Sequence, residues 1–278
     1  MDRIQQTNPS KSRRQGTVNQ RYKGSWELKW YGPADQNGNQ KRISETVRGT
    51  KKEAEKILRE RLLSVDNGSF VDKSKETVSE FMNRWLKTYA ATNVTLRTAH
   101  GYEGYSRRYI NPTIGKIALQ SLTPSQVQKV YADILDRGLS NTTVLHLHRL
   151  LKEALGHAVK WGILARNVAD AASPPRSEQK QMAMWDVPTI IDFLELSHGT
   201  RFGHIHEFAV LTGLRRSEIC GLKWESVDLE AGSLSVVATL QRIKGHGLVT
   251  GTPKTKRSRR TVDLAPETIE LLRTIRGG

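Results

Sequence analysis

The stretch Leu211-Thr-Gly-Leu-Arg-Arg-Ser-Glu-Ile-Cys-Gly-Leu-Lys-Trp-Glu-Ser-Val-Asp228 decides how this 278-residue chain is interpreted. Thr212-Gly213 separates an apolar run from a short helix, so the pattern predicts Arg215 in the first turn of that helix. Backbone N–H groups at a helix start favour an anion, and a guanidinium there can hold a phosphate as a two-pronged fork. Glu218 lies three residues on and can reach Arg215 across one turn. The alternative is a surface arginine in an ordinary helical hairpin.

The composition points to a polyanionic partner. The chain has 44 Lys+Arg against 28 Asp+Glu, a formal net charge of +16, and a pI of about 10.1. Nucleic acid is the usual partner of such a basic chain. An acidic membrane surface is the competing target, but the mean hydropathy is −0.54 and no apolar run approaches the ~18 residues of a membrane span. We therefore expect a nucleic acid as the partner and no membrane span.

Two further features bound the class of protein. The start, Met1-Asp-Arg-Ile-Gln-Gln, lacks the apolar core of a signal peptide, which predicts a cytoplasmic location. The single cysteine, Cys220, excludes an internal disulfide and a multi-cysteine zinc site. We expect Cys220 to pack as a small apolar residue in the helix that begins near Arg215.

Residues 1–75 have the pattern of a small, separate, basic domain. They hold 17 Lys+Arg and 9 Asp+Glu, so their net charge is 17 − 9 = +8. Apolar side chains alternate with polar ones from Trp26 to Trp30, as in a half-buried strand, and a second strand is expected over about residues 40–48. Thr50-Lys-Lys-Glu53 is a capping box that predicts a helix start. The pattern predicts a three-stranded sheet with one helix.

Residues 76–172 read as an all-helical domain of four or five helices. Thr77-Val-Ser-Glu80 is a second capping box. A helix from about Thr95 should end before Asn111-Pro112, because the residue before a proline disfavours helix. Thr123-Pro124 starts another helix with threonine as the cap, and a further helix begins near Ser140. His146 and His148 lie two apart and cannot share a helical face, so we interpret them as packing or surface residues rather than a metal pair.

Beyond a Pro-rich linker, residues 173–182, the pattern returns to mixed elements. Asp186 with Pro188 predicts a helix start before the Arg215 stretch. Two strands are expected next, over residues 234–240 and 259–264. The basic run Pro253–Arg260 between them is commonly a solvated turn or a general phosphate patch.

Taken together, these stretches resemble the tyrosine recombinase (bacteriophage integrase) family. Its first signature box reads Thr-Gly-Leu-Arg, two residues, Glu, then Leu-x-Trp and an acidic residue, matched here from Thr212 to Asp228. The resemblance implies an α+β multidomain protein with four parts: an arm-type DNA-binding domain (1–75), a helical core-binding, SAM-like domain (76–172), a linker (173–182) and the N-terminal part of a mainly-α catalytic domain with a β-hairpin (183–278). In such arm-type domains the sheet lies in the major groove.

The resemblance also assigns roles to residues. Arg215 becomes a catalytic arginine supported by Glu218, and Lys254 the lysine that donates a proton to the departing 5′ oxygen, with Lys256 as the fallback. Basic residues over the whole chain are candidate DNA contacts, although each can also be ordinary solvated surface. They are Arg21, Lys23, Lys29, Lys41, Arg42, Arg97, Arg107, Arg108, Lys116, Arg149, Lys256 and Arg257.

In this family a tyrosine attacks the scissile phosphate and forms a 3′-phosphotyrosyl link, with no metal or nucleotide cofactor. The resemblance therefore implies double-stranded DNA, at attachment sites, as the partner, and a homotetramer on that DNA. Here all seven tyrosines precede Arg215, and no His-x-x-Arg follows Lys254. We therefore expect a C-terminally truncated member that is inactive alone. It is either an incomplete site-specific recombinase or a DNA-binding remnant that occupies attachment sites. A basic transcription factor with a helical clamp leaves Arg215 and Lys254 unexplained.

Overall fold

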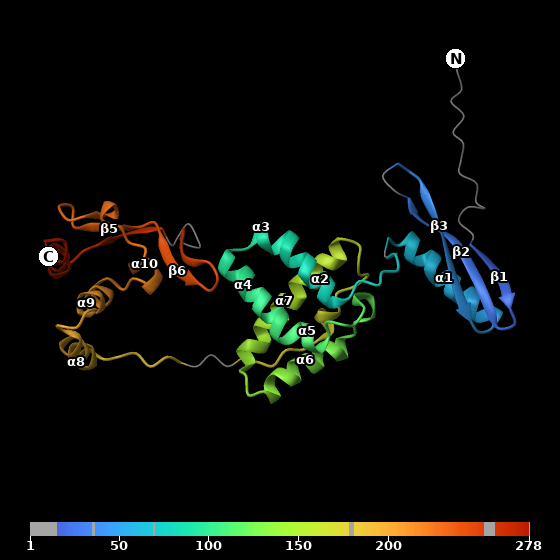
Figure 1. The fold of residues 1–278 in the computed structure, drawn as a ribbon, viewed down its shortest axis with the longest axis horizontal. Helices are drawn as coiled ribbons and strands as arrows, with labels where there is room; N and C mark the ends of the chain where they lie inside the picture. The colour runs from blue at the N-terminus through green and yellow to red at the C-terminus, as the bar shows by residue number, and fades with distance from the viewer. Residues whose placement is uncertain (1–15, 35–36, 69, 178–180, 253–258, 278) are drawn as a thin grey trace, which may run out of the picture. The chain divides into compact units, whose positions relative to one another are not determined.

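A computed structural model describes residues 16–34, 37–68, 70–177, 181–252 and 259–277. The chain divides into two compact units, residues 1–178 and residues 179–278. Helices and small antiparallel sheets are mixed in it, and the predicted α+β class is confirmed (Figure 1).

The first unit begins with an antiparallel sheet of order β1-β2-β3. One helix, α1, packs against one face of this sheet (Figure 1). The alternation predicted around Trp26 is confirmed, because Leu28 and Trp30 are buried against Ala54 and Leu58 of the helix. Thr50 accepts a hydrogen bond from the backbone N–H of Glu53, so the helix starts at the predicted capping box. The elements are β1 (Thr17–Tyr22), β2 (Ser25–Ala34), β3 (Gln40–Arg48) and α1 (Lys51–Asp66).

The helical part of this unit is built around one continuous apolar core. Its largest fully buried side chains include Phe81, Trp85 and Tyr131. The predicted caps at Thr77, Thr123 and Ser140 all accept a hydrogen bond from the backbone N–H three residues on. The elements are α2 (Val78–Trp85), η2 (Leu86–Ala90), α3 (Ala91–Asn93), α4 (Leu96–Tyr105), η3 (Ser106–Ile110), α5 (Asn111–Thr113), η4 (Leu119–Ser121), α6 (Pro124–Asp136), α7 (Asn141–Lys160) and η5 (Val168–Ala171).

One predicted helix end is wrong. The helix that starts at Thr95 does not stop before Asn111-Pro112 but runs through the π-helical segment η3 into α5. Pro112 has no N–H to donate, and the helix continues through it after the π-helical segment, in which the Asn111 N–H bonds to the Ser106 carbonyl.

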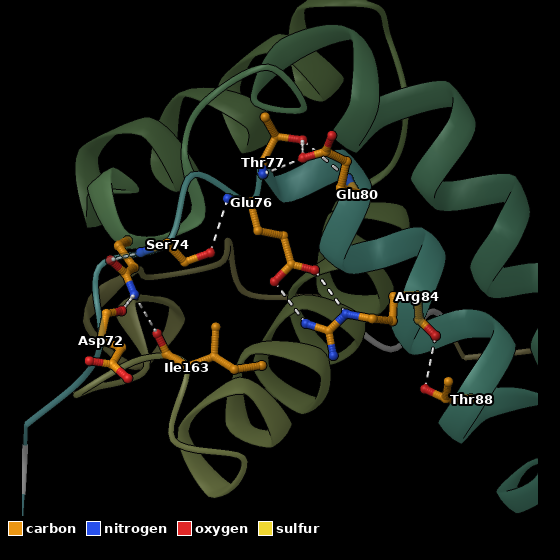
Figure 2. Close-up of polar contacts among 9 residues, drawn as sticks. Asp72, Ser74, Glu76, Thr77, Glu80, Arg84, Thr88 and Ile163 are labelled. Carbon is orange, nitrogen blue, oxygen red and sulfur yellow. Dashed lines mark hydrogen bonds and ion pairs between the residues drawn. The ribbon is translucent and has the colours of Figure 1, made fainter. Parts of the chain in front are cut away.

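A polar network fastens residues 72–77 to the helical core (Figure 2). The side-chain amide of Gln120 donates to the carbonyl oxygens of Asp72 at 2.7 Å and Ile163 at 3.2 Å, and its oxygen accepts from the Ser74 N–H at 3.1 Å. Glu76 forms a two-pronged ion pair with Arg84, at 2.8 and 2.7 Å. The segment that leads into α2 is thus held by hydrogen bonds as well as by its capping box.

The second unit has a small core in which α9 and α11 pack with a three-stranded sheet of order β4-β5-β8. The predicted helix start at Asp186 is confirmed. The elements are α8 (Val187–Ser197), α9 (Gly203–Thr212), α10 (Arg216–Ile219), η6 (Trp224–Ser226), β4 (Val227–Asp228), β5 (Ser233–Val236), β6 (Thr239–Ile243), β7 (Gly247–Gly251), β8 (Arg260–Asp263) and α11 (Pro266–Gly277).

Two predictions for this unit are corrected. The single strand expected over residues 234–240 is two strands, because β5 pairs with β4 and β8 whereas β6 leaves that sheet and forms a hairpin with β7. The break lies at the half-exposed Val237. Cys220 does not pack inside: it is exposed, since it caps the C-terminal end of the four-residue helix α10.

Candidate functional site

Arg215 lies at the start of α10, and its backbone position is fixed from both sides. α9 ends at Thr212, and Gly213 follows in a left-handed conformation with φ +62°, which glycine adopts without steric cost. Leu214 is buried in the core of the second unit. Arg215 then follows with a side chain that is 70% exposed. The turn therefore presents the guanidinium to solvent from an anchored backbone.

The carboxylate of Glu218 holds this arginine. The side chain of Glu218 is only 3% exposed. One oxygen, Oε2, accepts from the backbone N–H of Arg215 at 2.9 Å, and Oε1 accepts from Nη1 of the same residue at 2.9 Å. The predicted contact between Glu218 and Arg215 is thus present, and it fixes both the backbone and one end of the guanidinium.

A second arginine, Arg260 of strand β8, binds the same carboxylate. Arg260 donates from Nη1 to Oε1 at 3.0 Å and from Nη2 to Oε2 at 2.9 Å, which is the two-pronged geometry of a strong arginine–carboxylate pair. Hydrogen bonds from Arg260, followed by those from Arg215, outweigh the opposing effect of burial and lower the pKa of Glu218 to about 2. Glu218 therefore stays ionised at any physiological pH.

Arg260 was not among the predicted site residues, although the sequence held a signal for it. Val262 and Leu264 pack against the core of the second unit. Because side chains alternate along a strand, Arg260 must lie on the same side as Val262. The predicted catalytic lysine Lys254, with Lys256 and Arg257, lies outside the described residues.

Three of the predicted DNA contacts lie on the open face of the N-terminal sheet, the face that α1 does not cover. Strand pairing places Lys29 opposite Thr17 and Ser44, and Tyr31 opposite Arg42, on the side that α1 does not cover. Arg21 reaches the same face, where its guanidinium lies 3.6 Å from Glu27. Besides the predicted Arg21, Lys29 and Arg42, this open face holds Arg48, which pairs with Ser25 at the end of β3 and is exposed.

The other two predicted contacts in this domain lie elsewhere. Lys23 is in the turn between β1 and β2, where it is exposed. Lys41 alternates with Arg42 along β3, so its side chain lies on the side of Ile43, which packs toward the helix. Strand register thus separates Lys41 from the open face, and its place in the turn separates Lys23 from it.

The predicted contacts in the helical part are all exposed but come from separate elements. Arg97 is in the first turn of α4, and Arg149 is on α7. Arg108 donates to the Gly104 carbonyl at 3.1 Å and lies over the Tyr109 ring. Arg107 shares η3 with it, and Lys116 follows α5 in a turn.

Two of the three histidines of α7, His146 and His148, have tyrosine partners. Nδ1 of His148 lies 2.8 Å from the Tyr131 hydroxyl, and that of His146 lies 3.4 Å from the Tyr105 hydroxyl. Burial, together with Lys152, lowers the pKa of His148. These contacts give both side chains a structural role within the helical part.

Comparison with known protein families and solved structures identifies the class of protein to which the chain is similar. Residues 77–135 match the family described as phage integrase, N-terminal SAM-like domain, and residues 180–277 match the phage integrase family. The fold is similar to that of the Tn1549 transposon integrase, solved with a circular intermediate DNA, with a TM-score of 0.65, 22% identity and coverage of 73% of this chain and 66% of that one. A lambda integrase dimer bound to a core site gives a TM-score of 0.51 at 17% identity, covering 63% and 62% of the two chains.

The sequence relatives agree. The chain is 30% identical over 255 residues to a tyrosine recombinase XerC-like protein of Caldanaerobacter subterraneus subsp. tengcongensis, covering 86% of this chain and 65% of that protein. It is 26% identical to an integrase of Saccharopolyspora erythraea, covering 68% of this chain and 43% of that protein. The chain belongs to the tyrosine recombinase, or phage integrase, family.

The chain is shorter than these relatives, since it spans 65%, 43% and 58% of the first three curated proteins that it matches. Within the part of the chain that the structure describes, no helix combines the length and the apolar character needed to cross a membrane.

Proposed function

We propose that this chain supplies the DNA-binding parts and one phosphate-binding arginine of a site-specific DNA recombinase. The observation that carries the proposal is the buried carboxylate of Glu218, which fixes Arg215 while 70% of the arginine side chain stays exposed. An exposed arginine held this firmly is suited to bind a phosphodiester, which carries one negative charge and gains a second as a nucleophile attacks it.

The geometry suggests how Arg215 acts. Glu218 engages Nη1 and the backbone N–H, and an arginine has five N–H donors. The donors on Nε and Nη2 that Glu218 does not take can hold two oxygens of one phosphate. When a tyrosine oxygen attacks the phosphorus, negative charge grows on those oxygens, and a guanidinium that is already oriented stabilises it without reorganisation.

We propose further that Lys254, or Lys256 in its place, gives the departing 5′ oxygen its proton. The tyrosine would remain linked to the 3′ phosphate, which conserves the energy of the broken bond, so that no metal or nucleotide cofactor is needed. We infer that the protein acts as a homotetramer on two duplexes.

Duplex DNA binding is assigned to two basic surfaces. The open face of the sheet is one, and the exposed arginines of the helical part, with Lys116, are the other. Fluorescence anisotropy with a labelled duplex tests this: the logarithm of affinity should fall linearly with the logarithm of salt, by about 0.9 per phosphate neutralised. An affinity independent of salt would exclude DNA binding through these surfaces.

Arg215→Ala separates binding from chemistry. In the protein made from the native gene, we expect duplex affinity to stay within about two-fold, because Arg215 contributes one of many phosphate contacts. Cleavage of an attachment-site duplex should fall by about 10²-fold or more, as for loss of one preorganised donor. Equal loss of binding and cleavage would give Arg215 a structural role only.

A second candidate function follows from the tyrosines, all seven of which precede Arg215. If the native protein held no tyrosine beyond these 278 residues, it would bind attachment sites without cutting them and compete with an intact integrase. The intact mass of the native gene product distinguishes the two functions: 31.3 kDa favours the competitor, and a larger mass with a downstream tyrosine favours the recombinase. A covalent adduct of the 278 residues on a nicked suicide duplex would contradict the competitor.

A further inference from the structure

Glu27 is the one acidic side chain that strand register places on the open face of the N-terminal sheet, among the described residues of its three strands. It lies on the central strand β2, between Asn19 of β1 and Thr46 of β3. Its side chain is only 13% exposed, although α1 covers the opposite face of the sheet. Neighbouring side chains on the open face therefore enclose it.

Those neighbours fix the carboxylate. Oε2 lies 2.9 Å from the Lys29 ammonium, and Oε1 accepts from the Ser44 hydroxyl at 3.0 Å and lies 3.6 Å from the Arg21 guanidinium. The hydrogen bonds from Lys29 and Ser44 lower the pKa of Glu27. The group is thus an ionised, acceptor-only side chain, and a carboxylate has about four lone-pair positions, more than these three neighbours occupy.

A carboxylate at this place disfavours simple phosphate binding. It repels a phosphate backbone and partly neutralises Arg21 and Lys29, two of the cations that would bind one. In direct recognition of bases, however, a carboxylate has a definite use, since it accepts from the amino group of cytosine and is repelled by the acceptor edges of guanine and thymine. Because Glu27 lies on the central strand of the sheet, its position suits contact with the edge of a DNA base better than contact with the sugar–phosphate backbone of the DNA.

We propose that Glu27 is a specificity-determining residue that accepts a hydrogen bond from the exocyclic amino group of a cytosine in the major groove. The proposal rests on the proposed DNA binding by the open face. Lys29 and Ser44 hold the carboxylate in place, and Arg21, Arg42 and Arg48 supply phosphate contacts around it.

Selection from a pool of randomised DNA duplexes tests this with the whole chain. Wild type should enrich a motif in which one position prefers cytosine by about ten-fold or more. Glu27→Gln should change that position toward adenine, because a glutamine amide pairs with the N6 and N7 of adenine. Every other position of the motif should stay as in wild type. Glu55→Gln on the exposed side of α1 is the matched control for the loss of one negative charge, and its motif should be unchanged.

The outcomes separate the inference from the proposed function. If Glu27→Gln enriches the wild-type motif and only binds more tightly, Glu27 acts on charge alone and the inference is overturned. If wild type binds duplexes but enriches no motif, the open face does not read sequence. The role of Glu27 in specificity is then overturned, while the proposed DNA binding stands. Should Glu27→Gln unfold, Glu27→Asp keeps the charge on a shorter side chain. It should retain the cytosine preference with a smaller ratio, and an unchanged ratio would contradict direct contact.

Discussion

Replacing Glu218 with glutamine tests the core of the candidate site. Glu218→Gln keeps the shape of the side chain but removes the charge that both Arg215 and Arg260 bind. Its amide N–H₂ group would also face donors from one of these arginines. Two guanidinium groups would then lie close together without a counter-charge, so we expect the second unit to lose stability.

The magnitude follows from the pKa of Glu218. A fall from 4.5 to about 2 corresponds to about 3 kcal/mol at 1.36 kcal/mol per pKa unit. Arg260 and Arg215 have side chains that are 32% and 70% exposed, and solvent screening lowers the expected loss to about 2 kcal/mol. For a unit of this size, that is a fall in Tm of roughly 8–16 °C.

The pH dependence has a defined sign. Because the folded pKa of this carboxyl is lowered, its contribution is fully present above about pH 4.5 and is lost as the pH falls toward 2. Wild type should lose this part of its stability over that range, and Glu218→Gln should not. The difference between the two proteins should therefore shrink on acidification.

Calorimetry of the whole chain, with hydrogen exchange of peptides spanning residues 208–228 to assign the transition, measures the effect. Glu225→Gln is the matched control, since Glu225 is exposed on η6 in the same unit and loses the same charge. A Tm of Glu218→Gln within about 2 °C of wild type would refute the reasoning that the two arginines depend on this carboxylate.

Three further predictions concern the helical part of the first unit. Thr77→Ala removes the N-cap of α2 and should lower the free energy of unfolding of the helical part by about 1 kcal/mol, measured by urea titration. An equal loss in Thr92→Ala, which changes an exposed threonine, would contradict a special role for the cap. Gln120→Ala should speed amide exchange in residues 72–76, because the bridge in Figure 2 is lost; unchanged protection there would contradict the bridge. The pKa of His148 is lowered by burial, so its stabilising contribution is complete above about pH 6.5 and is lost as the pH falls. His148→Gln should reduce the stability difference between pH 7.5 and pH 5, and an undiminished difference would assign it to other groups.

Local signals in the sequence predicted the element starts well. A capping box needs only a side chain and a backbone N–H three residues apart, so Thr50, Thr77 and Thr123 could be placed without tertiary information. Pro112 was misplaced because a π-helical segment altered the helix before it, and nothing in the local pattern marks that change.

The site was predicted only as far as its contacts are local. Glu218 and Arg215 are three residues apart and meet within one turn. Arg260 is 42 residues from Glu218, and the pair forms because β8 joins β5 beside α10. Likewise, the sequence places Lys29 and Glu27 two apart, but the approach of Ser44 and Arg21 depends on the register of three strands.

Three enclosed carboxylates in this basic chain share one arrangement. Glu27, Glu45 and Glu218 have side chains that are 13%, 13% and 3% exposed, and each lies against two cations. In a protein of net charge +16, neighbouring cations repel one another and spread apart unless an acid holds them. An acid at such a place lowers general attraction to DNA but fixes the direction of the cations it binds. On the open face of the sheet, loss of Glu27 should therefore raise affinity for arbitrary duplexes while weakening discrimination, whereas loss of Glu55, which lies outside that face, should leave discrimination unchanged. The cations each acid binds are Arg21 and Lys29 for Glu27, Arg61 and Lys73 for Glu45, and Arg215 and Arg260 for Glu218.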